Sequence, residues 1–270
     1  MSKTASITPS VGEVRTIAIL PAFSKLIERT IHNKLVQVLE ENKLIHPNQR
    51  GFQNGASTIN NLHDLKTILK SEVEKQASYR ANQIPTARRE KCFVLFLDLK
   101  KAFDSVRRDI LIQKMTFKQI PAYLIAAIAN WLSNTRNTIN DKNVCTNIGV
   151  PQGGILSPTL FNIYIDSLVE DLNYGNNTTL AYADDIVMVT RGKVDDLRTS
   201  IHIIEKWSRD NHIQVNLKKS AIFELKVDRR TRNTLPEVFM GFPTLAEYKY
   251  LGILFNDCGN MKANAKSLQM

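Results

Sequence analysis

Two adjacent acids, Asp184 and Asp185, interrupt an apolar stretch in the sequence LAYADDIVMVT. The flanking segments 179–183 and 186–190 are rich in β-branched and apolar residues, which predicts two strands joined by a tight turn that carries both acids. Aspartate is common in turns because its side chain bonds nearby backbone, so an ordinary polar turn is one interpretation. Two neighbouring carboxylates also repel each other, and a divalent cation would relieve that repulsion. A third acid in similar surroundings would favour a metal site.

The third acid is Asp98, which ends the segment CFVLFLD. Residues 92–97 are apolar throughout, as expected of a buried strand, so Asp98 would lie at the edge of a sheet. A helix is predicted over SVRRDILIQKM (105–115), and Asp98 could serve instead as the cap of that helix. If the strand end and the acidic turn meet at one sheet edge, their carboxylates would form a site of the kind that holds two Mg²⁺ ions for phosphoryl transfer.

Between these acids lies a segment rich in glycine and proline, GVPQGGILSP (149–158). Its glycine pair, Gly153 and Gly154, would let the backbone approach a ligand closely, although a bare glycine pair is more often only a turn. The following residues predict an amphipathic helix, with Ser157 as its N-cap and Pro158 in its first turn.

The order of these segments resembles the palm of a reverse transcriptase. The segments FLDLKKAFDSV, GVPQGGILSPTLFNIYI, LAYADD, IQVNLKKS and YKYLGI are similar to successive palm motifs of the reverse transcriptases of non-LTR retrotransposons. Upstream, VRTIAILPAFSKLIERTIHNKL and HPNQRGFQNGASTINNL resemble the fingers motifs of the same family, so that the resemblance covers residues 13–256. It implies an RNA-directed DNA polymerase core that transfers nucleotides with two metal ions.

The resemblance also implies the fold and its division. The expected fold is α+β, with the fingers and palm of a right-hand polymerase, a palm made of an antiparallel sheet backed by helices, and no thumb. The expected parts are a flexible lead (1–12), the fingers (13–91), the palm with the catalytic site and a primer-grip hairpin (92–256), and a tail (257–270).

The resemblance assigns roles to individual residues. Asp98, Asp184 and Asp185 would hold two Mg²⁺ ions, with Mn²⁺ as an alternative. Lys219 would protonate the pyrophosphate leaving group, although a solvated side chain is the default for a lone lysine. The nucleotide-binding residues would be Arg15, Leu99, Phe103 and Gln152, and the primer grip would comprise Tyr248, Leu251 and Gly252.

Three of these roles are specific. Phe103 would close against the sugar C2′ and exclude ribonucleotides, Gln152 would lie beside the incoming nucleotide, and Arg15 would grip its triphosphate. The alternatives are that Phe103 is the first apolar residue of a helix and that YKYLGI, from Tyr248, is an ordinary buried strand.

The sequence departs from the family pattern in the fingers. Thr16 stands where the family usually has proline, and GFQNGAS (51–57) stands where it often has GFR-x-GRS, so two basic side chains are missing. This departure favours one alternative, a catalytically degenerate, reverse-transcriptase-like protein that binds nucleic acid. A second alternative is an RNA-dependent RNA polymerase, against which the bulky Phe103 and the PQGGILSP loop argue.

Composition agrees with a polyanionic partner. The formal net charge of the 270 residues is +10, although excess lysine and arginine can also serve solubility. The expected partners are an RNA template, a DNA primer and deoxynucleoside triphosphates. No membrane is expected, because no apolar run reaches the length of a span. The three cysteines are widely spaced, which predicts no disulfide framework and an intracellular location, in the nucleus or cytoplasm.

Three further segments have a predicted helical role. Apolar residues from Phe23 to Leu39 recur at helical spacing and are expected to form core. Residues 70–91 are charge-dense and predict an exposed helix and loop, with a nucleic-acid contact through Arg80, Arg88 and Arg89 as the alternative. Residues 197–211 predict a second palm helix.

Overall fold

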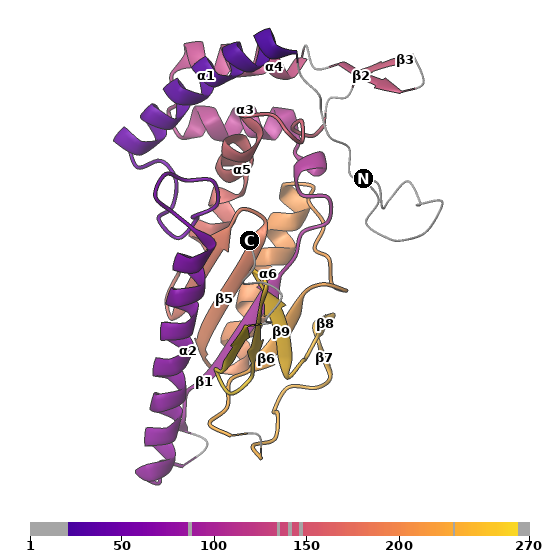
Figure 1. The fold of residues 1–270 in the computed structure, drawn as a ribbon. Helices are drawn as coiled ribbons and strands as arrows, with labels where there is room; N and C mark the ends of the chain where they lie inside the picture. The colour runs from indigo at the N-terminus through magenta and orange to yellow at the C-terminus, as the bar shows by residue number, and fades with distance from the viewer. Residues whose placement is uncertain are drawn as a thin grey trace. The chain divides into compact units, whose positions relative to one another are not determined.

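The computed structural model describes residues 21–85, 88–133, 136–139, 142–145, 148–228 and 230–263, with residues 136–139, 142–145 and 263 described by their backbone alone. The chain forms two compact units (Figure 1). The first unit comprises Met1–Leu44 and Lys101–Tyr164, and the second comprises Ile45–Lys100 and Ile165–Met270. These units are defined by packing, so the division into fingers and palm stays a prediction.

The second unit is built around a four-stranded antiparallel sheet in the order β4-β5-β1-β6. Its strands are β1 (Lys91–Leu97), β4 (Asn177–Tyr182), β5 (Asp185–Gly192) and β6 (Ala221–Glu224). Residues 92–97 of the central strand β1 are all buried, so both faces of the strand are covered, which explains the unbroken apolar run after Lys91. The register pairs Leu97 with Ile186, so the end of β1 lies beside the beginning of β5.

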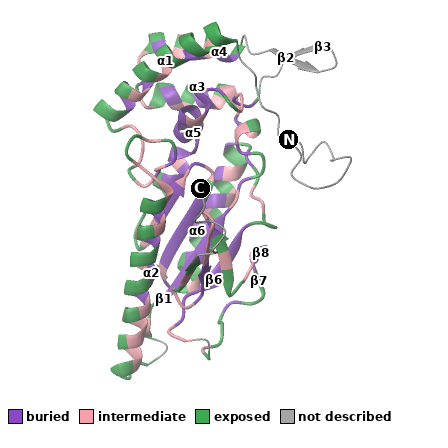
Figure 2. Ribbon diagram, in the orientation of Figure 1, coloured by how far each residue is buried: buried purple, intermediate pink, exposed green. Residues whose placement is uncertain are grey.

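Helices cover this sheet. Helix α2 (Thr58–Ala81) contributes Leu65 and Leu69 to a core cluster with one face of β1, and α6 (Val194–Asp210) packs against β5. Figure 2 shows the strands of the sheet as buried and α2 with an exposed outer face. The expected antiparallel palm sheet backed by helices is therefore confirmed, as is the expected helix near residues 197–211.

Smaller strands complete the second unit. The strands β9 (Glu247–Tyr250), β10 (Ile253–Asn256) and β11 (Met261–Ala263) form a three-stranded antiparallel sheet in the order β11-β10-β9. The strands β7 (Val238–Phe239) and β8 (Phe242–Pro243) form a short hairpin.

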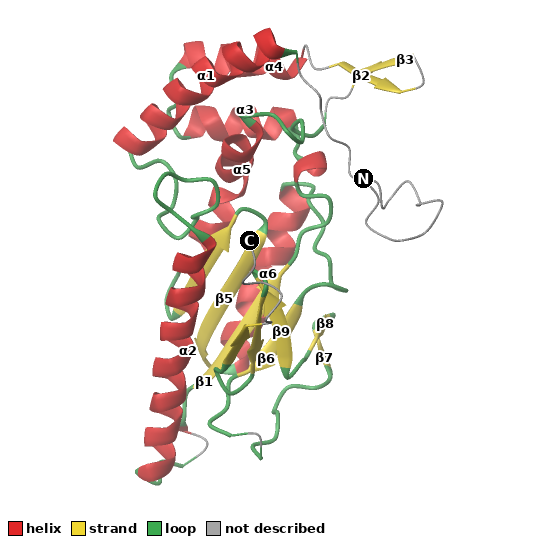
Figure 3. Cartoon of the chain, viewed as in Figure 1, coloured by secondary structure: helices red, strands yellow, loops and turns green. Residues whose placement is uncertain are grey.

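The first unit is mainly helical in its described part (Figure 3). It contains α1 (Ala22–Glu41), a short 3₁₀ helix η2 (Phe103–Ser105), α3 (Arg108–Phe117), α4 (Ala122–Ser133) and the hairpin of β2 (Arg136–Ile139) and β3 (Lys142–Cys145). Helix α5 (Ser157–Leu172) begins in this unit and ends in the second. No helix in the described part of the chain is long and apolar enough to cross a membrane.

One alternative and one expectation about helices are wrong. The helix after β1 begins at Arg108, ten residues beyond Asp98, so Asp98 is not its cap. The apolar stripe of α1 is core only in its second half, because Leu35, Val38 and Leu39 are buried. In the first half, Phe23, at 74% exposure, lies on the surface. Periodicity reports that a helix is amphipathic but not whether another element covers its apolar face.

Candidate active site

The turn between β4 and β5 carries the paired acids. Tyr182 pairs with Asp185, so Ala183 and Asp184 are the two turn residues and Asp185 is the first residue of β5. The sequence predicts both acids in the turn, whereas the structure places Asp185 in the strand. Ala183 has a φ of 56°, the left-handed conformation that two-residue hairpin turns require.

Asp98 follows β1 directly and lies in the same unit as the paired acids. Its carboxylate Oδ1 accepts a hydrogen bond of 2.8 Å from the Asn216 side-chain amide. Its backbone N–H donates to Ser220 Oγ at 3.0 Å, and its carbonyl accepts from the Asn216 N–H at 2.8 Å. These bonds fix both the backbone and the side chain of Asp98. No local sequence signal points to the role of Asn216, which stands 118 residues further along the chain.

The three carboxylates lie close enough for their charges to interact. Desolvation, followed by the charges of Asp184 and Asp98, raises the pKa of Asp185 to about 6, and the Lys219 ammonium group opposes this shift. Asp185 keeps solvent-exposed surface, so the surrounding protein removes only part of its hydration. Burial, followed by the charges of Asp98 and Asp185, likewise raises the pKa of Tyr248 to about 12. The structure therefore brings together five of the predicted site residues.

The donor chemistry of this acidic cluster suits a hard cation, because carboxylate oxygens are the ligands that Mg²⁺ prefers. Within the described ranges, however, no three acidic, histidine or cysteine side chains converge closely enough to form a metal site as they stand. Mutual repulsion of the carboxylates would favour such a separation. The residues thus fit a divalent cation by their type and charge, and the ligand geometry itself is not formed.

The predicted primer-grip residues form a hairpin beside the acids. Leu251 and Gly252, with φ of 44° and 84°, make the turn between β9 and β10. The Tyr248 ring stacks on Phe96 of β1 with centroids 4.4 Å apart, and its hydroxyl donates to the Lys219 carbonyl at 2.5 Å. Tyr248 therefore ties the hairpin both to the four-stranded sheet and to the backbone of Lys219.

Tyr250 is a site neighbour that the sequence did not single out. Its hydroxyl donates to the backbone carbonyl of Asp185 at 3.3 Å, and it packs in the same core cluster as β1. Leu99, expected near the nucleotide, is buried and forms a β-bridge with Val215. Its side chain is therefore part of the core, and only its backbone could line a nucleotide site.

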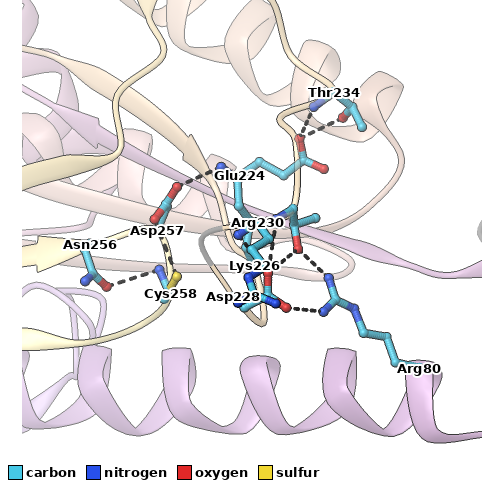
Figure 4. Close-up of polar contacts among 10 residues, drawn as sticks. Arg80, Glu224, Lys226, Asp228, Arg230, Thr234, Asn256, Asp257 and Cys258 are labelled. Atoms are coloured by element: carbon cyan, nitrogen blue, oxygen red, sulfur yellow. Dashed lines mark hydrogen bonds and ion pairs between the residues drawn. The ribbon is translucent and has the colours of Figure 1, made fainter.

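Polar contacts hold the β9–β10 hairpin and its neighbours in place (Figure 4). Lys226, which follows β6, forms an ion pair of 2.9 Å with Asp257, and the two side chains are only 9% and 8% exposed. Arg80 of α2 forms an ion pair of 2.6 Å with Asp228. Arg89 Nε donates to the Ile84 carbonyl at 2.7 Å. Arg80 and Arg89 thus have partners within the fold, which favours a structural role over the alternative of a nucleic-acid contact.

Phe103 and Gln152 belong to the first unit. The Phe103 ring stacks on Phe161 of α5 with centroids 4.7 Å apart, and its carbonyl accepts from the Val150 N–H at 3.0 Å. Gln152 Nε2 donates to Asp104 Oδ1 at 2.9 Å. The 3₁₀ helix that carries Phe103 and the loop that carries Gln152 are therefore joined. Arg15 lies outside the described residues.

A buried acid supports that loop. Glu28 of α1 has no exposed surface, and its Oε1 accepts from the Leu156 N–H at 3.4 Å. A Cβ on Gly154 would lie 2.7 Å from the same oxygen, so a larger residue there would displace this carboxylate. Desolvation raises the pKa of Glu28. An acid within an otherwise amphipathic helix was the only sequence signal for this contact.

Comparisons with a family model and with known proteins agree on one family. A family model described as "Reverse transcriptase (RNA-dependent DNA polymerase)" matches residues 3–255. The probable RNA-directed DNA polymerase from transposon BS of Drosophila melanogaster is 32% identical over 263 residues, which cover 88% of this chain and 27% of that protein. The probable RNA-directed DNA polymerase from the transposon X-element of the same species is 29% identical over 263 residues. These residues cover 90% of this chain and 26% of that protein. This chain thus spans about a quarter of the length of these relatives.

Solved structures support the same fold. A telomerase structure from Candida tropicalis, in complex with a fragment of telomeric RNA, superposes with a TM-score of 0.61 over 92% of this chain and 38% of that one, at 14% identity. The apo telomerase of the same species gives a TM-score of 0.59 at 12% identity. At such low identity the likeness concerns the fold, and it confirms the α+β architecture expected from the sequence.

Proposed function

Because the chain belongs to the reverse transcriptase (RNA-dependent DNA polymerase) family, we propose that it forms the catalytic core of an RNA-directed DNA polymerase from a non-LTR retrotransposon. The observation that carries this proposal is the placement of Asp98, Asp184 and Asp185 at adjacent ends of neighbouring strands of one sheet. The raised pKa of Asp185 supports it, because part of that shift comes from the two other carboxylates.

The acids are the proposed metal ligands. Asp98, Asp184 and Asp185 would hold two Mg²⁺ ions, or Mn²⁺ in their place, and the ions would activate the primer 3′-hydroxyl and neutralise charge on the phosphates. The chain's own contribution is to fix these carboxylates, as the bonds from Asn216 and Ser220 fix Asp98. Fixed ligands need no reorganisation when the reaction begins.

The remaining residues would handle substrates. Lys219 is exposed and close enough to stabilise the Asp185 carboxylate, which supports a role near the reacting phosphates as the donor of a proton to pyrophosphate. Tyr248, Leu251 and Gly252 would position the primer end as a hairpin. The resemblance to the family motifs also assigns Arg15, Phe103, Gln152 and the backbone of Leu99 to the incoming nucleotide.

The proposed partners are an RNA template, a DNA primer and deoxynucleoside triphosphates. The formal net charge of +10 supports polyanionic partners, because neutralising phosphates releases counterions and so drives binding. The bulk of Phe103 supports deoxynucleotides as substrates, since an RNA polymerase must admit the ribose 2′-hydroxyl.

Primer extension tests the proposal. The purified chain should extend a DNA primer on an RNA template with Mg²⁺ or Mn²⁺, and Asp98→Asn or Asp184→Asn should abolish synthesis without unfolding the protein. Asp210→Asn is a matched control, because it removes an exposed carboxylate at the end of α6. Synthesis by Asp98→Asn at the parent rate would refute the metal site. RNA binding without synthesis by the parent would instead support the degenerate alternative, which the missing basic residues of segment 51–57 favour.

A further inference from the structure

A buried glutamine contacts the turn that carries the acids. Gln49 has no exposed surface, and its Oε1 accepts hydrogen bonds of 2.9 Å from the backbone N–H groups of Ala183 and Gly51. Its Nε2 donates to the Ala183 carbonyl at 3.2 Å. A single side-chain amide therefore binds both polar backbone groups of Ala183, as a neighbouring strand would.

The backbone around Gln49 extends this pairing along β4, which is one of the two edge strands of the four-stranded sheet. The Ala181 N–H donates to the Asn48 carbonyl, and the Arg50 N–H donates to the Ala181 carbonyl, each at 2.9 Å. The approach is so close that a Cβ on Gly51 would lie 2.2 Å from the Ala183 nitrogen. Residues 48–51 thus form a brace along the edge of the hairpin, and Gly51 leaves the space for it.

Ala183 has a backbone conformation that the brace can hold in place. Its φ of 56° is a conformation that residues with a Cβ rarely adopt and that surrounding contacts must hold in place. The next residue is Asp184, followed by Asp185. A change of backbone conformation at Ala183 would therefore redirect both carboxylates.

We infer that Gln49 is a positioning residue, which holds Ala183 in its left-handed conformation and thereby directs the Asp184 and Asp185 carboxylates toward the metal ions. This inference rests on the proposed function. It predicts that loss of the Gln49 bonds weakens metal binding and the chemical step, while the binding of nucleic acid and nucleotide is kept.

The first test is Gln49→Met, which keeps the length of the side chain and removes its hydrogen bonds. We expect kcat for primer extension to fall by about 100-fold, the loss that a displacement of about 1 Å causes at an active site. At saturating Mn²⁺, the KM for deoxynucleotide and the Kd for primer-template should stay close to the parent values. Mn²⁺ titration of the protein without nucleic acid, followed by electron paramagnetic resonance, should show weaker binding.

The matched control is Asn211→Leu at the C-terminal end of α6. The Asn211 side-chain amide is also buried, and its Nδ2 donates to the Trp207 carbonyl at 2.9 Å. This variant should lower the thermal stability as Gln49→Met does. It should leave Mn²⁺ affinity and kcat close to those of the parent, because this hydrogen bond lies at the end of α6 and not along β4 or its turn.

Two further variants separate conformation from packing. Gly51→Ala should reproduce the loss of Mn²⁺ affinity, because the added Cβ forces the brace away from Ala183 while Gln49 is unchanged. Adding Ala183→Gly to Gln49→Met should restore part of the affinity, since glycine adopts a positive φ readily. If Gln49 acted only by filling space, adding Ala183→Gly would not restore the Mn²⁺ affinity lost in Gln49→Met. If Gln49→Met does not fold, the Mn²⁺ affinity of Gly51→Ala tests the inference.

The outcomes distinguish this inference from the proposed function. Parent-like Mn²⁺ affinity and kcat in Gln49→Met or Gly51→Ala would overturn the inference while leaving the function intact. A parent protein that neither binds Mn²⁺ nor extends a primer would refute the function itself.

Discussion

At the scale of single residues, Asp185 gives the site its pH dependence. Desolvation, with the charges of Asp184 and Asp98, raises its pKa to about 6, whereas the unfolded chain should titrate near the ordinary value of about 4. The folded state therefore binds this proton more tightly than the unfolded state. The resulting stabilisation is complete below about pH 4 and is lost as the pH rises through about 6.

This titration makes a prediction for metal-free protein. Asp185→Asn removes the titrating group, so its melting temperature relative to the parent should rise between pH 4 and pH 7. Thermal unfolding at each pH measures the difference, and Asp210→Asn serves as the exposed control. A difference that does not change with pH would show that folding does not raise the pKa of Asp185. Mn²⁺ should also bind the parent more weakly below about pH 6, because protons compete for Asp185.

A second prediction at this scale concerns Phe103, whose ring stacks on Phe161. If the ring closes against the sugar, Phe103→Val should raise kcat/KM for ribonucleotides relative to deoxynucleotides, and Phe103→Tyr should keep the parent ratio. Discrimination by a clash can exceed the roughly 1–3 kcal/mol available from one misfit methylene. Thermal stability must be measured as well, because the valine loses the aromatic stack. A lower stability with an unchanged ratio would make Phe103 a packing residue only.

At the scale of elements, the attachment of the β9–β10 hairpin depends on a buried ion pair. Lys226 and Asp257 are almost fully buried, and the Lys226 N–H also donates to the Asp257 carbonyl at 2.7 Å. Burying two charges is favourable only while they neutralise each other. The hairpin that carries Tyr248 is therefore sensitive to the loss of either charge.

Removing one charge of this buried pair should cost much more stability than removing both. Asp257→Asn should lower the free energy of unfolding by about 3–5 kcal/mol, because it leaves the Lys226 ammonium group buried without its partner. Adding Lys226→Met should recover most of that loss. In the exposed pair of Lys75 and Glu90, Glu90→Gln should cost at most about 1 kcal/mol. Urea denaturation measures all three, and an equal cost for the buried and exposed pairs would contradict this account.

At the scale of the whole molecule, the net charge of +10 should govern the binding of the proposed nucleic-acid partners. Affinity that comes from phosphate contacts falls linearly with the logarithm of salt concentration, with a slope of about −0.9 for each contact with duplex DNA. We expect primer-template binding to weaken steeply between about 50 and 200 mM salt, and products from one binding event to be short. Fluorescence anisotropy measures the slope. Binding that is independent of salt would show that charge is not the main source of affinity.

The sequence by itself determined the elements that carry the acids. Strands β1, β4 and β5, the turn at Asp184 and helices α5 and α6 were all predicted, because apolar periodicity and turn residues act over a few positions. The family also followed from the sequence, since the motifs carry its chemistry in order. The assigned roles of Lys219, Phe103 and Gln152 stay predictions.

Only the tertiary structure decided how the acids are held. The bond from Asn216 to Asp98 spans 118 positions, and that from Gln49 to Ala183 spans 134. The tertiary structure also decided which apolar faces are covered. The exposed first half of α1, around Phe23, is an example. A side chain's local pattern records its polarity and its place on a helix or strand. The partner it meets depends on how distant segments pack, because hydrogen bonds and burial are properties of pairs of residues that folding brings together.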